Sequence, residues 1–111
     1  MNLGLSMITV FNKSYCKKLL FLIHKQIHPK QYHKEKDETF FVLYGKILLK
    51  IWYKNKKIEK ILKPGDLYTI KPTYIHWFQS ISKDGSIIEE LSTEAKKTDS
   101  FYLDDKITKN K

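Results

Sequence analysis

Short apolar and aromatic runs alternate with polar turns along the whole chain, and none of them has convincing start and stop signals of a helix. Eight or nine of these runs have the length and residue types of β-strands. The expected strands are 7–11, 15–23, a strand beginning at 31–33, 38–44, 46–53, 58–62, 67–70, 76–81 and 86–91. Turn residues separate them at fairly even spacing, which predicts an all-β sandwich or barrel.

Several polar segments mark the expected turns. Pro64-Gly65 is the clearest, because proline presets φ and glycine accepts the positive φ of a type II turn. Segments 54–57 and 83–85 are expected hairpin turns, and 34–37 is an expected charged turn. We interpret 24–29 as a connection, with Pro29 at a strand start or edge because proline cannot donate to the sheet.

A chain of 111 residues is long enough for one domain and too short for two. We expect residues 1–14 to form an N-terminal segment with a short edge strand, and residues 15–103 to form the barrel. Phe101-Tyr102-Leu103 is expected to pack back onto the barrel after a loop at 93–100. Residues 104–111 are expected to form a frayed tail.

The net charge of +9 comes from lysine alone, since the chain has no arginine. Lysines attract phosphates without specificity, whereas base readout usually depends on the arginine fork, so we expect no specific nucleic-acid partner. The longest apolar run, 19–23, is far shorter than a membrane span, which needs about 18 residues. The N-terminus lacks the features of a signal peptide, so the cytoplasm is the expected location. Cys16 is alone and is interpreted as a small buried apolar residue.

Polar residues with metal-binding chemistry fall on several of the expected strands. Because strand side chains alternate between faces, Gln31 and His33 point the same way. Glu38 follows across a short turn and shares its face with Phe40, and His76 comes from a distant strand. Nitrogen and oxygen donors from neighbouring strands can form a metal pocket inside a barrel. A single histidine is more often structural or exposed, so the spacing alone leaves both interpretations open.

The segment 31–45 resembles the first motif of the cupin superfamily. That motif has H-x-H, three or four residues, a glutamate, six residues and a glycine. Gln31-Tyr32-His33 occupies the H-x-H position, and Glu38 and Gly45 follow at the motif's spacing.

The segment 65–76 resembles the second cupin motif, a glycine followed by P-x-G and a histidine. Gly65 and His76 are in register, whereas Lys71 and Thr73 occupy the positions of the motif's proline and second glycine. The resemblance covers roughly residues 15–102, most of the chain, and implies a single-domain cupin jelly-roll barrel.

The cupin resemblance implies that Gln31, His33, Glu38 and His76 hold one divalent transition metal, namely zinc, manganese, nickel or iron. Gln31 departs from the pattern, because histidine is usual at that position. A glutamine oxygen can coordinate a metal, although it binds softer transition metals less strongly than imidazole. The alternative is a degenerate site in which Gln31 only makes hydrogen bonds.

Four segments carry a narrower resemblance to sugar-associated cupins: 15–20, 36–40, 87–93 and 98–104. These relatives include the cupin module of nonulosonate synthases, D-lyxose isomerase and cupin-type mannose-6-phosphate isomerase. The resemblance implies a metal-binding protein of carbohydrate metabolism that acts on or senses a sugar or sugar phosphate. It also implies an isomerase or epimerase as the enzyme type, and we expect a homodimer.

Isomerisation of a sugar needs a base that moves a proton between adjacent carbons. Glu90 shares strand parity with Ile88 and can project into the pocket, as can Glu89 if the parity runs the other way. Lys36 lies beside the candidate ligands, so Glu90 and Lys36 are the candidate catalytic residues. Lys36 can equally be a solvated turn residue. The alternative functions are a non-catalytic small-molecule-binding module and a metal-dependent dioxygenase.

Overall fold

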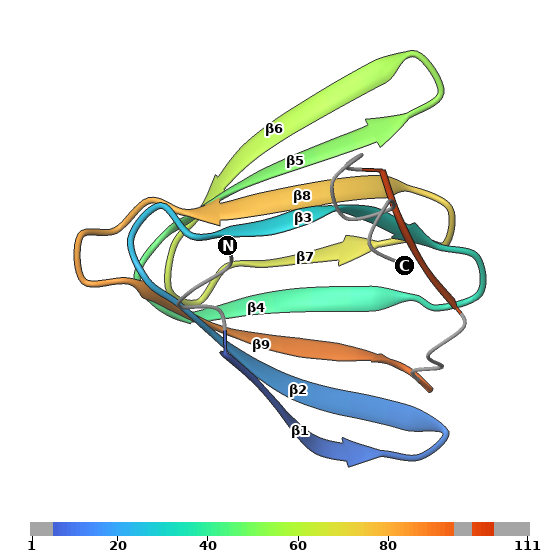
Figure 1. The fold of residues 1–111 in the computed structure, drawn as a ribbon, viewed down its shortest axis with the longest axis horizontal. Helices are drawn as coiled ribbons and strands as arrows, with labels where there is room; N and C mark the ends of the chain where they lie inside the picture. The colour runs from blue at the N-terminus through green and yellow to red at the C-terminus, as the bar shows by residue number, and fades with distance from the viewer. Residues whose placement is uncertain (1–5, 95–98, 104–111) are drawn as a thin grey trace.

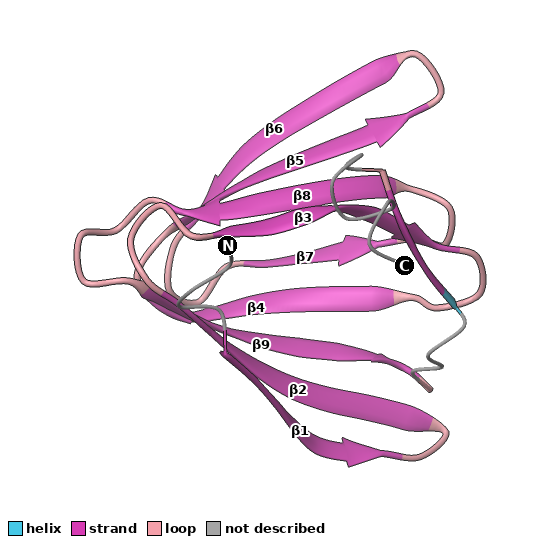
Figure 2. Cartoon of the chain, in the orientation of Figure 1, coloured by secondary structure: helices cyan, strands magenta, loops and turns pink. Residues whose placement is uncertain are grey.

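Two five-stranded antiparallel sheets face each other in the computed structural model, which describes residues 6–94 and 99–103 (Figure 1). One sheet has the strand order β1-β2-β9-β4-β7 and the other β10-β3-β8-β5-β6. The strands are β1 (Ser6–Asn12), β2 (Tyr15–Leu22), β3 (Ile27–His33), β4 (Glu38–Tyr44), β5 (Ile47–Tyr53), β6 (Lys56–Leu62), β7 (Leu67–Ile70), β8 (Ile75–Ser80), β9 (Ser86–Thr93) and β10 (Ser100–Tyr102). The all-β, single-domain prediction is therefore confirmed (Figure 2).

The strand assignments from the sequence agree with the structure over most of the chain. β1 lies at the edge of its sheet, within the N-terminal segment for which an edge strand was expected. The short strand β10 comes from the segment that was expected to pack back, and it pairs with the end of β3. The expected tail at 104–111 and part of the expected loop at 93–100 lie outside the described residues. Within the described ranges, no helix is long and apolar enough to cross a membrane.

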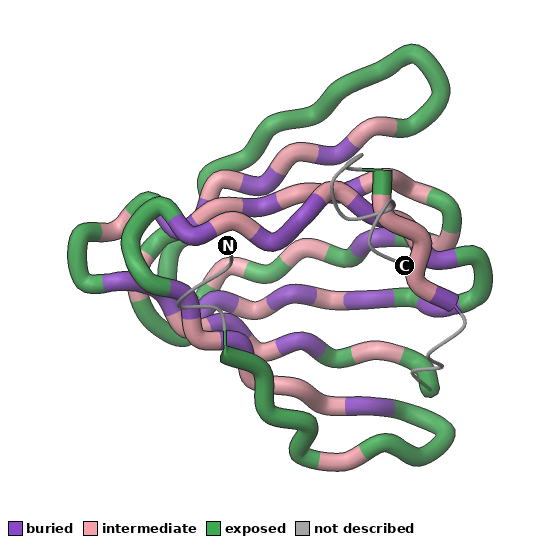
Figure 3. Tube along the Cα trace, in the orientation of Figure 1, coloured by how far each residue is buried: buried purple, intermediate pink, exposed green. Residues whose placement is uncertain are grey.

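The core lies between the sheets and follows the alternation of strand side chains. In β4, Glu38, Phe40 and Val42 are buried, whereas the residues between them are half-buried (Figure 3). Phe40 packs edge-to-face on Phe78 of the opposite sheet, with 5.1 Å between the ring centroids. The sheets are therefore joined by apolar contacts, and polar side chains on the same interior faces must share that buried space.

β3 begins earlier than the sequence analysis expected. Ile27, His28 and Pro29 were interpreted as part of a connection, but they belong to the strand. The register with β8 shifts between His28 and Gln31, and Pro29 lies in that irregularity, where a missing N–H is tolerated. Because of the shift, His28 and Gln31 are both buried although they are three positions apart, an odd spacing that would place them on opposite faces of a regular strand.

The expected turns have the backbone conformations that their residues favour. Gly65 has φ 93°, and Asp66 N–H donates to the Lys63 carbonyl across the Pro64-Gly65 turn. Gly45 has φ 75°, and a Cβ there would clash with the carbonyl oxygen of Gly85. Glycine at position 45 is therefore required both by its φ and by the close approach of a second turn.

Candidate metal centre

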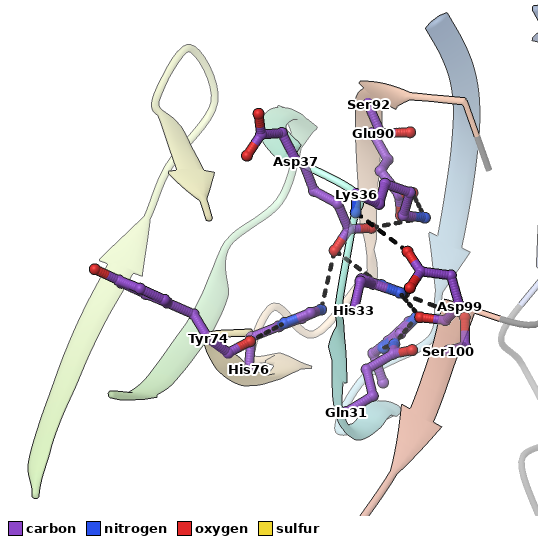
Figure 4. A network of polar contacts seen from close by, with 12 residues as sticks. Gln31, His33, Lys36, Asp37, Tyr74, His76, Glu90, Ser92, Asp99 and Ser100 are labelled. Atoms are coloured by element: carbon purple, nitrogen blue, oxygen red, sulfur yellow. Dashed lines mark hydrogen bonds and ion pairs between the residues drawn. The ribbon is translucent and has the colours of Figure 1, made fainter. Parts of the chain in front are cut away.

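Three side chains from different strands converge at the end of the barrel that is crossed by β10 (Figures 1 and 4). Oε1 of Glu38 lies 3.2 Å from Nε2 of His33 and 3.1 Å from Nε2 of His76. The three candidate ligand atoms all lie within 4.8 Å of one another. Each of these residues is at most 5% exposed, so the cluster is almost completely shielded from solvent.

The fold determines this convergence. His33 is the last residue of β3 and Glu38 the first of β4, and the four-residue connection between them passes from one sheet to the other. His76 lies in β8, next to β3, and pairs with Gln31. The sequence therefore places two candidate ligands on either side of one short turn and the third on the adjacent strand.

Backbone carbonyl groups orient both imidazole rings. The Asp99 carbonyl oxygen lies 3.0 Å from Nδ1 of His33, and the Tyr74 carbonyl oxygen lies 3.3 Å from Nδ1 of His76. Since a carbonyl only accepts, each Nδ1 must carry the proton that it donates. In the neutral ring the Nε2 lone pair is then left facing Glu38, which is the usual arrangement for a histidine that binds a metal.

Buried polar atoms at the centre of the cluster lack hydrogen bonds. Oε1 of Glu38 and Nε2 of His76 have no hydrogen-bond partner among the described residues, despite their short separation. Burial favours the neutral form of Glu38, but hydrogen bonds and positive charge from the imidazoles of His33 and His76, in their protonated form, outweigh it and hold the pKa of this carboxyl well below its usual value. A carboxylate and two imidazole lone pairs that face one another fit a divalent cation, because a cation satisfies all three.

Gln31 lies beside this cluster. Its Nε2 donates to Nδ1 of His28 at 2.7 Å, and the His28 ring stacks on Phe78 with 4.7 Å between centroids. The structure therefore brings together His33, Glu38 and His76, with the Gln31 amide nitrogen turned to His28. The role of Gln31 as a fourth ligand stays a prediction.

His28 was not among the site residues predicted from the sequence. Burial, followed by the charge of His76, lowers the pKa of His28 to about 3, so its ring is neutral near physiological pH. Pro29 was the sequence signal that could have identified His28. A proline within a strand indicates a bulge, and a bulge changes which side chains face inward.

Lys36 and Glu90 lie directly beside the candidate ligands. Nζ of Lys36 is 3.2 Å from Oε2 of Glu38 and 3.3 Å from Oε2 of Glu90, and both Lys36 and Glu90 are buried (Figure 4). Glu90 faces inward with Ile88, whereas Glu89 faces outward and pairs with Lys17 at 2.8 Å. Although Lys36 belongs to a charged turn, its side chain is directed into the barrel.

The charges of this second cluster are strongly coupled. Burial and the negative charge of Glu38 raise the pKa of Glu90 to about 8. Burial opposes a charged Lys36, but the carboxylates of Glu38 and Glu90 raise its pKa overall. The site thus contains a positive lysine between two carboxyl groups, one of which titrates near neutral pH.

A family model described as cupin matches residues 24–110. The D-lyxose/D-mannose isomerase of Thermosediminibacter oceani is 30% identical over 132 aligned positions, which cover 96% of this chain and 71% of that protein. The D-lyxose ketol-isomerase of Cohnella laeviribosi is also 30% identical, with 94% and 70% covered. That of Thermofilum sp. is 30% identical, and the match spans 62% of its length and 80% of this chain.

Solved structures agree with the fold. Oxalate decarboxylase from Bacillus subtilis matches with a TM-score of 0.81 at 17% identity, covering 96% of this chain and 30% of that chain. KdgF from Halomonas sp. matches with a TM-score of 0.74 at 14% identity, covering 86% and 83%. At these identities the likeness concerns the fold alone. The chain belongs to the cupin family, and its sequence is related to the D-lyxose isomerases.

Proposed function

We propose that this protein is a metal-dependent aldose–ketose isomerase for a sugar of the D-lyxose or D-mannose type. The observation that carries the proposal is the buried His33–Glu38–His76 cluster with the Lys36–Glu90 pair beside it. The names of the related proteins supply the substrate class. The proposal joins a site suited to holding a cation with a carboxyl group suited to moving a proton.

The reaction moves one hydrogen between neighbouring carbons without any net change in composition. His33, Glu38 and His76 would hold a divalent metal, which supplies polarisation of the sugar carbonyl and a fixed position for the adjacent hydroxyl. A base then removes the proton from the hydroxyl-bearing carbon and returns it to the former carbonyl carbon. The hydroxyl proton moves to the former carbonyl oxygen, so the new carbonyl forms on the neighbouring carbon.

Glu90 is the proposed base, since its buried carboxyl lies next to the cluster and is not one of its three donors. Lys36 keeps Oε2 of Glu38 and Oε2 of Glu90 in fixed positions by contacting both. The positive charge of its ammonium group also stabilises the negative charge that develops on the sugar oxygens during proton transfer. Lys36 and Glu90 therefore have distinct roles, in charge stabilisation and proton transfer respectively.

The test is an assay of the metal-loaded protein with D-lyxose and D-mannose, in ordinary and in heavy water. We expect the corresponding ketoses to form, with some deuterium incorporated at the carbon that receives the proton. Glu90→Gln should bind metal normally and lose about 10²–10⁴-fold in kcat, the usual contribution of a positioned base. If metal-loaded wild-type protein neither forms ketose nor exchanges protons, the isomerase proposal fails and the non-catalytic sugar-binding module becomes the better account.

A second candidate function is a metal-dependent dioxygenase. One observation favours it: the converging donors are two histidines and one carboxylate, the ligand set of many non-haem iron(II) oxygenases. Oxygen consumption by the iron(II)-loaded protein in the presence of candidate organic substrates tests this function. The isomerase is the preferred candidate because the curated relatives with 30% identity carry isomerase names.

A further inference from the structure

Asp99, the residue before β10, is buried and binds the connection between β3 and β4. Its Oδ1 accepts a hydrogen bond from the backbone N–H of Lys34 at 2.9 Å, and its Oδ2 accepts one from that of Lys36 at 3.1 Å. The N–H of Glu35 lies 3.2 Å from Oδ1 and 3.3 Å from Oδ2. Three consecutive N–H groups therefore converge on one carboxylate, which restricts the conformation of this connection.

The main chain of the same residue contacts a candidate ligand. The Asp99 carbonyl oxygen accepts a hydrogen bond from Nδ1 of His33, 3.0 Å away, and this bond selects the tautomer whose Nε2 faces Glu38 (Figure 4). The carboxylate and the carbonyl of Asp99 thus act on neighbouring parts of one site. A shift of the Asp99 main chain would therefore alter both the orientation of His33 and the position of the connection.

The connection held by Asp99 is short and carries Lys36. Residues 34–37 separate the candidate ligands His33 and Glu38, so the conformation of these four residues determines how the two ligands meet. The Lys36 side chain extends from this connection to Glu38 and Glu90. A single buried residue therefore contacts His33 through its carbonyl and, through its carboxylate, the connection that leads to Glu38 and carries Lys36.

We propose that Asp99 is a positioning residue that sets the geometry of the metal centre from outside the ligand set. Its part in catalysis rests on the proposed function, but its effects on the His33 tautomer and on metal affinity do not. Groups that orient a metal ligand through hydrogen bonds commonly contribute about 10–100-fold to metal affinity. The Asp99 carboxylate acts on His33 indirectly, by fixing the main chain whose carbonyl contacts the ring, so its loss should weaken metal binding by up to a factor in this range.

The experiment compares Asp99→Ala and Asp99→Asn with wild type by calorimetric titration of manganese or zinc, well below the melting temperature. Nitrogen NMR of the histidine rings reports the His33 tautomer independently of activity. Asp66→Ala is the matched control. Oδ2 of Asp66 also accepts a hydrogen bond from a backbone N–H, that of Lys63 at 2.9 Å, but it lies in the turn before β7, at the end of that strand distant from Glu38. We expect Asp99→Ala to weaken metal binding and to disturb the His33 tautomer, while Asp66→Ala changes neither.

An Asp99→Ala protein that binds metal as tightly as wild type, with His33 in the same tautomer, overturns the proposal. If Asp99→Ala does not fold, Asp99→Asn decides the question, since it keeps one acceptor oxygen and removes the other. Weaker metal binding by Asp99→Asn supports the proposal, and unchanged binding contradicts it. Both readouts hold whether or not the wild-type protein isomerises a sugar, so failure of the proposed function is distinguished from failure of this inference.

Discussion

Glu38 and His76 belong to opposite sheets, yet Oε1 of Glu38 lies 3.1 Å from Nε2 of His76, and neither atom has a hydrogen-bond partner among the described residues. Burying polar atoms without partners costs free energy. The packing of Phe40 on Phe78 holds the two sheets together around this contact. The interior of the barrel therefore maintains a local arrangement that a bound cation would stabilise.

Replacing Lys36 with methionine should destabilise the protein strongly. The change keeps most of the apolar stem but leaves the buried carboxyl groups of Glu38 and Glu90 without their positive partner. Breaking a buried ion pair from one side costs about 3–5 kcal/mol, so we expect a loss of about 3 kcal/mol in the free energy of unfolding. Urea denaturation near neutral pH measures it.

Lys17→Met is the matched control, because Lys17 pairs with Glu89, the neighbour of Glu90 on β9, at the surface. This pair is only partly buried, with side chains 33% and 19% exposed, and a pair of this kind contributes about 1 kcal/mol or less. Equal losses in the free energy of unfolding of the two variants would show that the buried Lys36 contacts stabilise the protein no more than the Lys17–Glu89 pair does.

Gln31→His should strengthen metal binding. Gln31 is buried on the face of β3 that carries His33, and its backbone is paired with that of His76, so an imidazole there enters the space beside the three converging donors. Imidazole is a better ligand than an amide oxygen for zinc, nickel and iron. Titration of wild type and variant with the same metal compares their affinities. Tyr32→His, on the opposite face of β3, should leave the affinity unchanged; a similar gain there would contradict the positional argument.

Thr73 stores backbone strain next to the site. It has φ 72°, a conformation that β-branched residues rarely adopt, and its N–H donates to the carbonyl of His33. Asparagine accepts this conformation more readily, so Thr73→Asn should raise the free energy of unfolding by about 1 kcal/mol. Thr73→Val keeps the branched side chain and should bring no such gain. If thermal melts show Thr73→Asn to be no more stable than Thr73→Val, the backbone at position 73 is not strained.

His28 should make the stability depend on pH. Its pKa is about 3 in the folded protein, against an ordinary value of 6.5, so between these values the unfolded chain binds more protons. The associated stability is therefore present above about pH 6.5 and is lost as the pH falls toward 3. Between about pH 7 and pH 4.5, the free energy of unfolding of wild type should fall by about 2 kcal/mol more than that of His28→Gln. Denaturant titrations of both proteins at the two pH values measure the difference, and parallel losses would mean that His28 is not held neutral.

The sequence predicts the strands and the inward-facing residues well, because strand alternation and turn chemistry are local. Glu38 and Phe40 on one face, and Pro64-Gly65 at a turn, follow directly from such rules. The contact of His33 with His76 depends on pairing between distant strands, and only the two cupin-like motifs indicated it in advance. The structure supplies the distances that turn this indication into a specific three-residue cluster.

The residues missed by the sequence analysis depend on features that strand patterns do not encode. His28 faces inward because the register shifts beside Pro29, and a bulge reverses the simple alternation. Asp99 stands in a segment that was expected to be an ordinary loop, and its partners lie more than sixty residues earlier in the chain. Hydrogen bonds from a side chain to a distant backbone leave no periodic signal in the sequence.

Calorimetric titration of the purified, chelator-treated protein with a divalent metal tests the central claim most directly. Manganese, nickel, zinc and iron(II) should be tried in turn on wild type and on His76→Ala. The account predicts that wild type binds one metal ion per chain and that His76→Ala, which lacks one of the three converging donors, binds it much more weakly. No binding by wild type to any of these metals, or equal binding by His76→Ala, would contradict a metal centre formed by His33, Glu38 and His76.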